Sequence, residues 1–162
     1  MRDIRVIGDP VLRTSAEPIV DFDRDLRRLI DEMFAAMYAA EGVGLAGPQI
    51  GVSKRVFVYD CSNRKGHLIN PVLTVDDDTE IVDEEGCLSV PGRDTGTPIY
   101  ARTPRAAGVT VSGFDRLGRP VRLKARGLLA RCFQHETDHL EGLLYVDRLA
   151  KDAARQVLLQ AP

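Results

Sequence analysis

The residues of this sequence best suited to chemistry form the pentapeptide His135-Glu136-Thr137-Asp138-His139, an HExxH pattern. At 3.6 residues per turn, positions 135 and 139 lie on one face of a helix, so both imidazoles can reach a single metal ion. Glu136 is placed to take a proton from water held by that metal. The alternative interpretation of the pattern alone is a pair of hydrogen-bonded core histidines beside a solvated glutamate.

The third ligand of such a metal is not obvious downstream. The position of a third histidine in metzincins holds Tyr145, and Glu141 is the last glutamate of the chain. Asp147 and Asp152 would suit an HExxH zinc metallopeptidase, but Asp147 falls where the helix should be ending. The missing ligand is therefore expected upstream.

An upstream candidate is Cys87, in the segment EGCLS (85–89), which has a glycine on one side and a chain reversal at Pro91 soon after. Three interpretations are open for this thiol, namely a metal ligand, a buried small hydrophobe and a nucleophile paired with a histidine. Cys61 and Cys132 are interpreted as packing residues. A structural zinc site completed by Cys61 is a non-enzymatic alternative, although it gives Glu136 no role.

A further glycine-rich segment, GVGLAGPQ (42–49), allows close approach to the backbone, and Gln49 offers both a donor and an acceptor. No Lys-Ser/Thr pair follows, so the segment is not a phosphate loop. Its simpler interpretation is a helix end followed by a tight turn.

The elements that must position these residues indicate an α+β fold. An amphipathic helix is expected over 21–41 and is ended by Gly42, a second helix over 127–142 carries HExxH, and a third begins near Asp147. Strands are expected at 55–60, 67–70, 72–75, 108–114 and 121–125. We expect antiparallel or mixed strands packed around the central HExxH-bearing helix, with an N-terminal and a C-terminal helix. The segment 92–105 is expected to be a loop.

Length and composition limit the classes of protein that remain. The chain has 162 residues, 44% of them hydrophobic and 28% charged, which suits a single domain over 1–162. A net charge of −2 gives no reason to expect DNA as a partner. Three dispersed cysteines, no apolar leader and no apolar run of about 20 residues favour a cytoplasmic protein without a membrane span.

Three segments together, GVGLAGPQ (42–49), EGCLS (85–89) and QHETDHLEG (134–142), resemble the three signature motifs of peptide deformylases in order and separation. The resemblance extends over nearly the whole chain, including the opening IGDPVLR (7–13). It implies a hydrolase that removes the formyl group from the N-terminal methionine of nascent bacterial or organellar polypeptides and releases formate. It also implies transient contact with the ribosome.

The resemblance further implies roles for individual residues. The metal ligands would be Cys87, His135 and His139, and the ion would usually be Fe²⁺, with Zn²⁺, Ni²⁺ or Co²⁺ as replacements. The catalytic glutamate would be Glu136. The side chain of Gln49 and the backbone N–H of Leu88 would stabilise the oxyanion. The residues that bind the substrate would be Val43, Gly44, Gly86, Leu128 and Cys132.

The sequence departs from the family pattern in two places, and a third feature suggests an ion pair. Gly47 replaces an alanine of the first motif, which removes a methyl group but no functional group. Arg131 stands where some members have an aliphatic residue, and we expect its stem to line the pocket while its charge reaches water. Glu41 is expected to pair with Arg102 or Arg105 and so hold the 92–105 loop near the site.

Overall fold

The computed structural model describes residues 2–162 as a five-stranded sheet with three α-helices and three short 3₁₀ helices. In chain order the elements are η1 (Pro10–Arg13), α1 (Arg24–Ala39), β1 (Gly44–Ala46), η2 (Gly47–Ile50), β2 (Val56–Cys61), β3 (Arg64–Glu85), β4 (Ala101–Phe114), β5 (Pro120–Arg126), α2 (Gly127–Leu140), η3 (Tyr145–Arg148) and α3 (Lys151–Gln160). None of the helices within residues 2–162 has the length and apolar character needed to cross a membrane.

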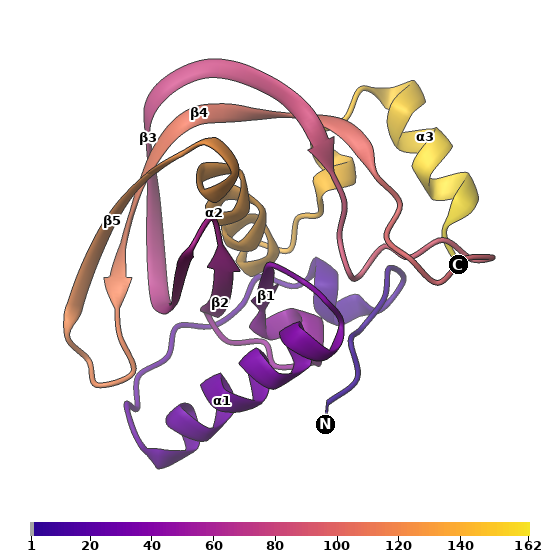
Figure 1. The fold of residues 1–162 in the computed structure, drawn as a ribbon. Helices are drawn as coiled ribbons and strands as arrows, with labels where there is room; N and C mark the ends of the chain where they lie inside the picture. Colours follow the sequence, from indigo (N-terminus) through magenta and orange to yellow (C-terminus); the bar gives the residue numbers. More distant parts are fainter. Residues whose placement is uncertain (1) are drawn as a thin grey trace.

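The sheet follows the order of the chain from β1 to β5, and every neighbouring pair is antiparallel. The α+β class is therefore confirmed, with an antiparallel rather than a mixed sheet. β3 and β4 are the longest strands and pair until Glu85 lies opposite Ala101. Shifts of register on both sides of Asp77 are bulges, which bend the paired strands. Figure 1 shows β3 and β4 arching over α2.

β2 shows how the sheet joins the two longest helices. Phe57 and Tyr59 face α2, where their ring centroids lie 5.9 and 5.0 Å from that of Phe133. Val56 and Val58 instead pack into the cluster that contains the buried face of α1. Successive residues of a strand point to opposite faces, so a strand covered on both sides needs a nearly continuous apolar run. β2 has such a run, and α2 is thereby fixed against the sheet.

α1 begins and ends close to the expected residues, but its terminator is different. The side chain of Asp23 accepts a hydrogen bond from Leu26 N at 3.0 Å and caps the first turn. At the other end Glu41, not Gly42, takes the left-handed conformation, with φ of 58°. Gly42 N then donates to Met37 O at 2.9 Å. This turn directs the chain into β1 and the segment 42–49.

Other element boundaries correct the expectations from the sequence. The segments 67–70 and 72–75 are parts of β3, which continues through the acidic run to Glu85. The chain from 92 to 105 is a loop only as far as Tyr100, because β4 begins at Ala101. The last helix begins at Lys151, after η3. The unpredicted parts of β3 and β4 were missed because they lack the apolar alternation typical of a half-buried strand.

Candidate metal centre and active site

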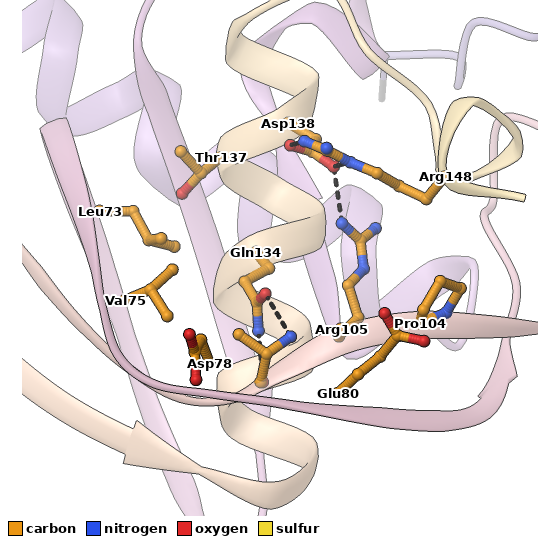
Figure 2. A pocket seen from close by; sticks show the side chains of 11 residues that line it. Leu73, Val75, Asp78, Glu80, Pro104, Arg105, Gln134, Thr137, Asp138 and Arg148 are labelled. Carbon is orange, nitrogen blue, oxygen red and sulfur yellow. Dashed lines mark hydrogen bonds and ion pairs between the residues drawn. The ribbon is translucent and has the colours of Figure 1, made fainter.

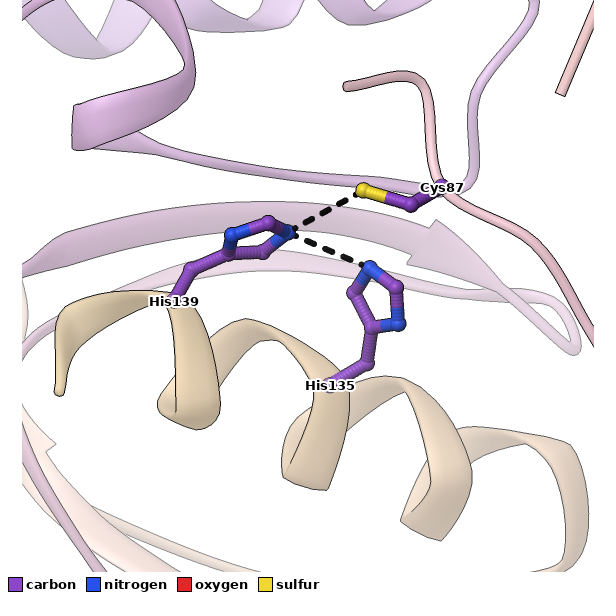
Figure 3. Close-up of side chains that lie close together, drawn as sticks. All are labelled: Cys87, His135 and His139. Carbon is purple, nitrogen blue, oxygen red and sulfur yellow. Dashed lines mark hydrogen bonds between the residues drawn. The ribbon is translucent and has the colours of Figure 1, made fainter. Parts of the chain in front are cut away.

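Three side chains from two distant segments converge on one point. His135 and His139 lie one turn apart on α2, and Cys87 follows the end of β3. His139 Nε2 lies 3.2 Å from His135 Nε2 and 3.4 Å from Cys87 Sγ. All three donor atoms lie within 4.8 Å of one another, and all three residues are buried. Figure 3 shows both imidazoles pointing from the helix toward the thiol.

This spacing fits a tetrahedral metal ion. With bonds of about 2.0–2.1 Å to nitrogen and about 2.3 Å to sulfur, two ligand atoms of a tetrahedral centre lie about 3.3–3.6 Å apart. The two distances from His139 Nε2, 3.2 and 3.4 Å, are close to that range. Two imidazole nitrogens and a thiolate also form a common donor set for Zn²⁺ and Fe²⁺. Three protein ligands leave a fourth position for water or substrate, as catalytic sites require.

The ring of His135 is oriented by a carboxylate behind it. His135 Nδ1 lies 2.7 Å from Glu85 Oε2, and the Glu85 side chain is 5% exposed. A proton held on Nδ1 leaves the lone pair of Nε2 directed at Cys87 and His139, which is the tautomer a metal ligand needs. Sequence reasoning missed this role of Glu85, although the residue stands in the EGCLS segment.

The electrostatics of the donors favour a cation. Burial, with the neighbouring His135 and Arg105, lowers the pKa of His139 well below its usual value, so this ring is neutral. Burial opposes the charge on His135, but Cys87, Glu136 and Glu85 outweigh it and raise the pKa of this histidine well above its usual value, so a metal ion would displace the proton from Nε2 when it binds. The surroundings that favour a proton on His135 would also favour a divalent ion in its place.

Glu136 lies beside the donors and is held against the glycine segment. It is 4% exposed, and within residues 2–162 its Oε1 atom has no hydrogen-bond partner. A Cβ added to Gly44 would lie 2.5 Å from Glu136 Oε2 and 3.1 Å from Cys132 Sγ. Burial raises the pKa of Glu136 to about 7. A carboxyl group with that pKa can both take and return a proton near neutral pH.

Gln49 presents an N–H donor to the same centre. Its Oε1 accepts from Ala46 N at 2.9 Å, which fixes the orientation of the amide. Its Nε2 donates to Ser89 Oγ at 3.1 Å and approaches Cys87 Sγ at 3.6 Å. Leu88 follows the thiol and packs near Gly42, where an added Cβ would lie 2.7 Å from Leu88 Cδ1.

The three motifs line one cavity of about 410 Å³ that opens beside Cys87, His135 and Glu136. All five residues expected to bind substrate lie on its wall, namely Val43, Gly44, Gly86, Leu128 and Cys132. Leu128 is 55% exposed, so it lies at the rim of this cavity. Tyr100 is a wall residue that the sequence did not reveal, and its ring would lie 2.9 Å from a Cβ added to Gly86.

Two expectations about charged residues are wrong. Arg131 does not reach water, because it is 7% exposed and bonded to Glu85 Oε1 at 3.0 Å. Arg105 does not pair with Glu41 but binds Glu85 and Asp138, each at 2.6 Å. Arg102 Nη2 donates to Val82 O instead. Buried acids attract the arginines because an unpaired charge is costly in the interior.

A second cavity, of about 390 Å³, lies on another face of α2 and shows how this helix is anchored (Figure 2). Arg105 and Arg148 both bind Asp138, the residue before His139. Gln134 bonds to the backbone N and O of Ala106 in β4, each at 3.0 Å. These contacts fix the helix that carries the two histidines.

The alternative ligands have other partners. Asp147 Oδ2 accepts from Arg13 Nη1 at 2.5 Å and from Leu144 N at 2.8 Å, so it starts η3 instead of reaching the metal centre. Cys61 lies in the core cluster with Cys132. Within residues 2–162, the group of His, Cys, Asp and Glu side chains able to hold a metal consists of Cys87, His135 and His139.

A buried glutamate beside two histidines and a thiol, with Cys87, His135 and Glu136 on the wall of one cavity of an α+β fold, defines a metal-dependent hydrolase. A family model described as polypeptide deformylase matches residues 1–155. The peptide deformylase of Acidothermus cellulolyticus is 53% identical over 149 residues, which are 92% of this chain and 79% of that protein. This chain belongs to the polypeptide deformylase family.

Solved structures agree with this membership. The crystal structure of a peptide deformylase from Legionella pneumophila matches with a TM-score of 0.89 and 42% identity, covering 99% of this chain and 92% of that one. The crystal structure of the peptide deformylase from Thermus thermophilus matches with a TM-score of 0.88 and 42% identity, covering 98% and 92%. An HExxH metallopeptidase is not favoured by these relationships.

Proposed function

We propose that residues 1–162 act as one catalytic domain that hydrolyses the N-terminal formyl group of nascent polypeptides beginning with formylmethionine. Water adds to the formyl carbon, the C–N bond breaks, and formate and a free amino terminus result. The observation that carries this proposal is the convergence of Cys87, His135 and His139 beside Glu136, at a cavity lined by Cys87, His135 and Glu136.

Cys87, His135 and His139 would hold one divalent ion, which we expect to be Fe²⁺, with Zn²⁺, Ni²⁺ or Co²⁺ as replacements. When bound, the ion would supply a Lewis acid that polarises the formyl oxygen and lowers the pKa of water. The thiolate supports this choice, because sulfur suits both Fe²⁺ and Zn²⁺.

The protons are assigned to Glu136. Its carboxylate would take a proton from the attacking water and later deliver it to the leaving amine nitrogen. The negative charge that develops on the formyl oxygen would be stabilised by Gln49 Nε2 and the backbone N–H of Leu88. Gln49 is already oriented for this task by its bond from Ala46 N at 2.9 Å.

The cavity supports methionine as the first residue of the substrate. Val43, Leu128 and Cys132 would provide apolar contacts for its thioether side chain. Gly44 and Gly86 would let the peptide backbone approach closely, since neither carries a side chain. The dimensions of the cavity suit a small extended segment better than a folded protein.

The substrate implies a place in the cell. Formylmethionyl chains arise at the bacterial ribosome, so we propose a cytoplasmic location and transient association with the ribosome. Lys151 and Arg155 in α3 are exposed and are candidates for that contact. Arg148 is less suitable, because it is bonded to Asp138.

An anaerobic assay tests this function. We expect the Fe²⁺-loaded protein to release formate from a formylmethionyl tripeptide and about one equivalent of metal to be present in the same sample. Formate release from the Fe²⁺-loaded protein no faster than from buffer, or cleavage of internal peptide bonds instead, would contradict the proposal.

A further inference from the structure

Arg131 connects the helix of the metal centre to the strands above it. It lies on α2, four residues before His135 and therefore on the same helix face. Its guanidinium is almost fully buried and donates three hydrogen bonds. Nη1 bonds to Glu85 Oε1 at 3.0 Å and to Thr103 O at 2.7 Å, and Nη2 bonds to Ile81 O at 2.9 Å.

These bonds reach both strands of the arch. Ile81 belongs to β3 and Thr103 to β4, and their carbonyl groups accept from the two terminal nitrogens of one guanidinium. A planar fork with fixed donor directions can hold two strands and a carboxylate at once, which the single ammonium of lysine cannot do in the same way.

Glu85 is shared between Arg131, Arg105 and His135. Its Oε1 accepts from Arg131 Nη1 at 3.0 Å and from Arg105 Nε at 3.1 Å. Its Oε2 accepts from Arg105 Nη2 at 2.6 Å and lies 2.7 Å from His135 Nδ1. Without Arg131, Oε1 would keep only its longer bond, and the plane of the carboxylate would be less firmly fixed.

Arg131 also supplies one of the positive charges that compensate the buried carboxylates. Two carboxylates, Glu85 and Asp138, face two buried guanidiniums, Arg105 and Arg131, with the half-exposed Arg148 at the edge. Without Arg131, the only guanidinium of residues 2–162 that binds Glu85 is that of Arg105, which also binds Asp138. A buried carboxylate with fewer partners tends to shift or recruit water.

We propose that Arg131 is a positioning residue that orients Glu85 and, through Glu85, sets the direction of His135 Nε2 toward the metal. The inference concerns ligand geometry and extends the proposed function, since the oriented ligand is one that the function requires. The stem of Arg131 also lines the substrate cavity, so one side chain joins the pocket wall to the metal centre.

The test compares Arg131→Met with Arg131→Lys and with the matched control Arg119→Met. Arg119 forms an exposed ion pair with Asp115 in the turn before β5 and lies outside the cavity. The holoenzymes are titrated with a chromophoric chelator to obtain the Zn²⁺ dissociation constant, and the Co²⁺-loaded proteins give absorption spectra. Turnover of a formylmethionyl peptide is measured in parallel.

We expect Arg131→Met to raise the metal dissociation constant roughly 10- to 100-fold, as losses of outer-sphere partners do, and to shift the Co²⁺ spectrum. Arg131→Lys should recover part of the affinity, and Arg119→Met should match the wild type. If Arg131→Met does not fold, Arg131→Lys alone decides, because its affinity and spectrum should still differ from wild type. Variants that fold with unchanged affinity and spectrum would overturn the inference.

Failure of the inference and failure of the proposed function give different results. A wild-type protein that binds metal but releases no formate would contradict the function, while an altered spectrum in Arg131→Met would still support the positioning role. Formate release by the wild type, with no change of affinity or spectrum in either Arg131 variant, would leave the function intact and remove the role of Arg131.

Discussion

Glu85 Oε2 lies 2.7 Å from His135 Nδ1, on the side of the ring away from the thiol of Cys87. The same carboxylate is bound by the guanidiniums of Arg105 and Arg131. A residue at the end of β3 therefore orients a ligand on α2 and pairs with two buried cations at the same time. The metal centre depends on the packing of these two elements as much as on the ligands themselves.

The first prediction concerns Glu85→Gln. The substitution leaves Arg105 and Arg131 without their shared carboxylate, so the free energy of unfolding should fall by about 3–5 kcal/mol. Urea denaturation of the metal-loaded protein measures this change. Glu84→Gln is the matched control, because Glu84 is the exposed neighbour, and its effect should stay within about 0.5 kcal/mol. Equal stabilities of the two variants would show that the buried pairs contribute little.

Glu136→Gln should separate metal binding from proton transfer. The amide keeps the size of the side chain but cannot accept a proton, so kcat should fall by about 10²- to 10⁴-fold. Metal content should stay at the wild-type level, since Glu136 is not among the three converging donors. Elemental analysis gives the metal content, and the rate of formate release from the same preparation gives kcat. Activity near that of the wild type would rule out Glu136 as the proton acceptor.

The two histidines could be predicted as a pair from the sequence because their spacing is local information. The spacing of His135 and His139 requires one helix face, and the resemblance to deformylases indicated Cys87, which the structure places 3.4 Å from His139. The amphipathic pattern of α1 likewise located that helix within a few residues of its bounds.

The charged network was beyond sequence reasoning because its partners come from separate elements. Arg131 looks like a surface residue on a helix, and only the arch of β3 and β4 over α2 makes it a buried donor. The acidic end of β3 gave no strand signal, since its exposed side chains do not alternate with apolar ones. Pairing with β4, a contact between distant segments, forms that strand.

Gln49→Leu should reduce the turnover rate more than it weakens binding of the substrate. Loss of the Nε2 donor beside Cys87 should lower kcat by about 10²- to 10³-fold with a small change in KM. Ser89→Ala is the control, because it removes the hydroxyl that accepts from Gln49 but leaves the Gln49 donor in place. Steady-state kinetics on a formylmethionyl peptide decide the question. Equal losses of kcat in the two variants would assign the effect to their mutual bond instead of to the oxyanion.

Removal of the metal distinguishes the hydrolase mechanism from a cysteine nucleophile. A chelator should abolish formate release, and addition of Fe²⁺ or Co²⁺ under anaerobic conditions should restore it, because Cys87 acts as a ligand in the proposed mechanism. The control is a sample that is treated with the chelator and then receives the metal ion again without delay. Activity that persists in protein shown to be free of metal would favour a nucleophilic Cys87.

Gly44→Ala should damage the site without touching a metal ligand. The new methyl group would lie 2.5 Å from Glu136 Oε2 and 3.1 Å from Cys132 Sγ, so the carboxylate must move. A displacement of about 1 Å in a reacting group can cost about 10²-fold in rate, and we expect kcat to fall by that order while the metal is retained. Val43→Ala, at the neighbouring half-exposed position of the cavity, should mainly raise KM because it only removes apolar contact. If Gly44→Ala raised KM and spared kcat as well, the contact between this glycine and the glutamate would have no bearing on proton transfer.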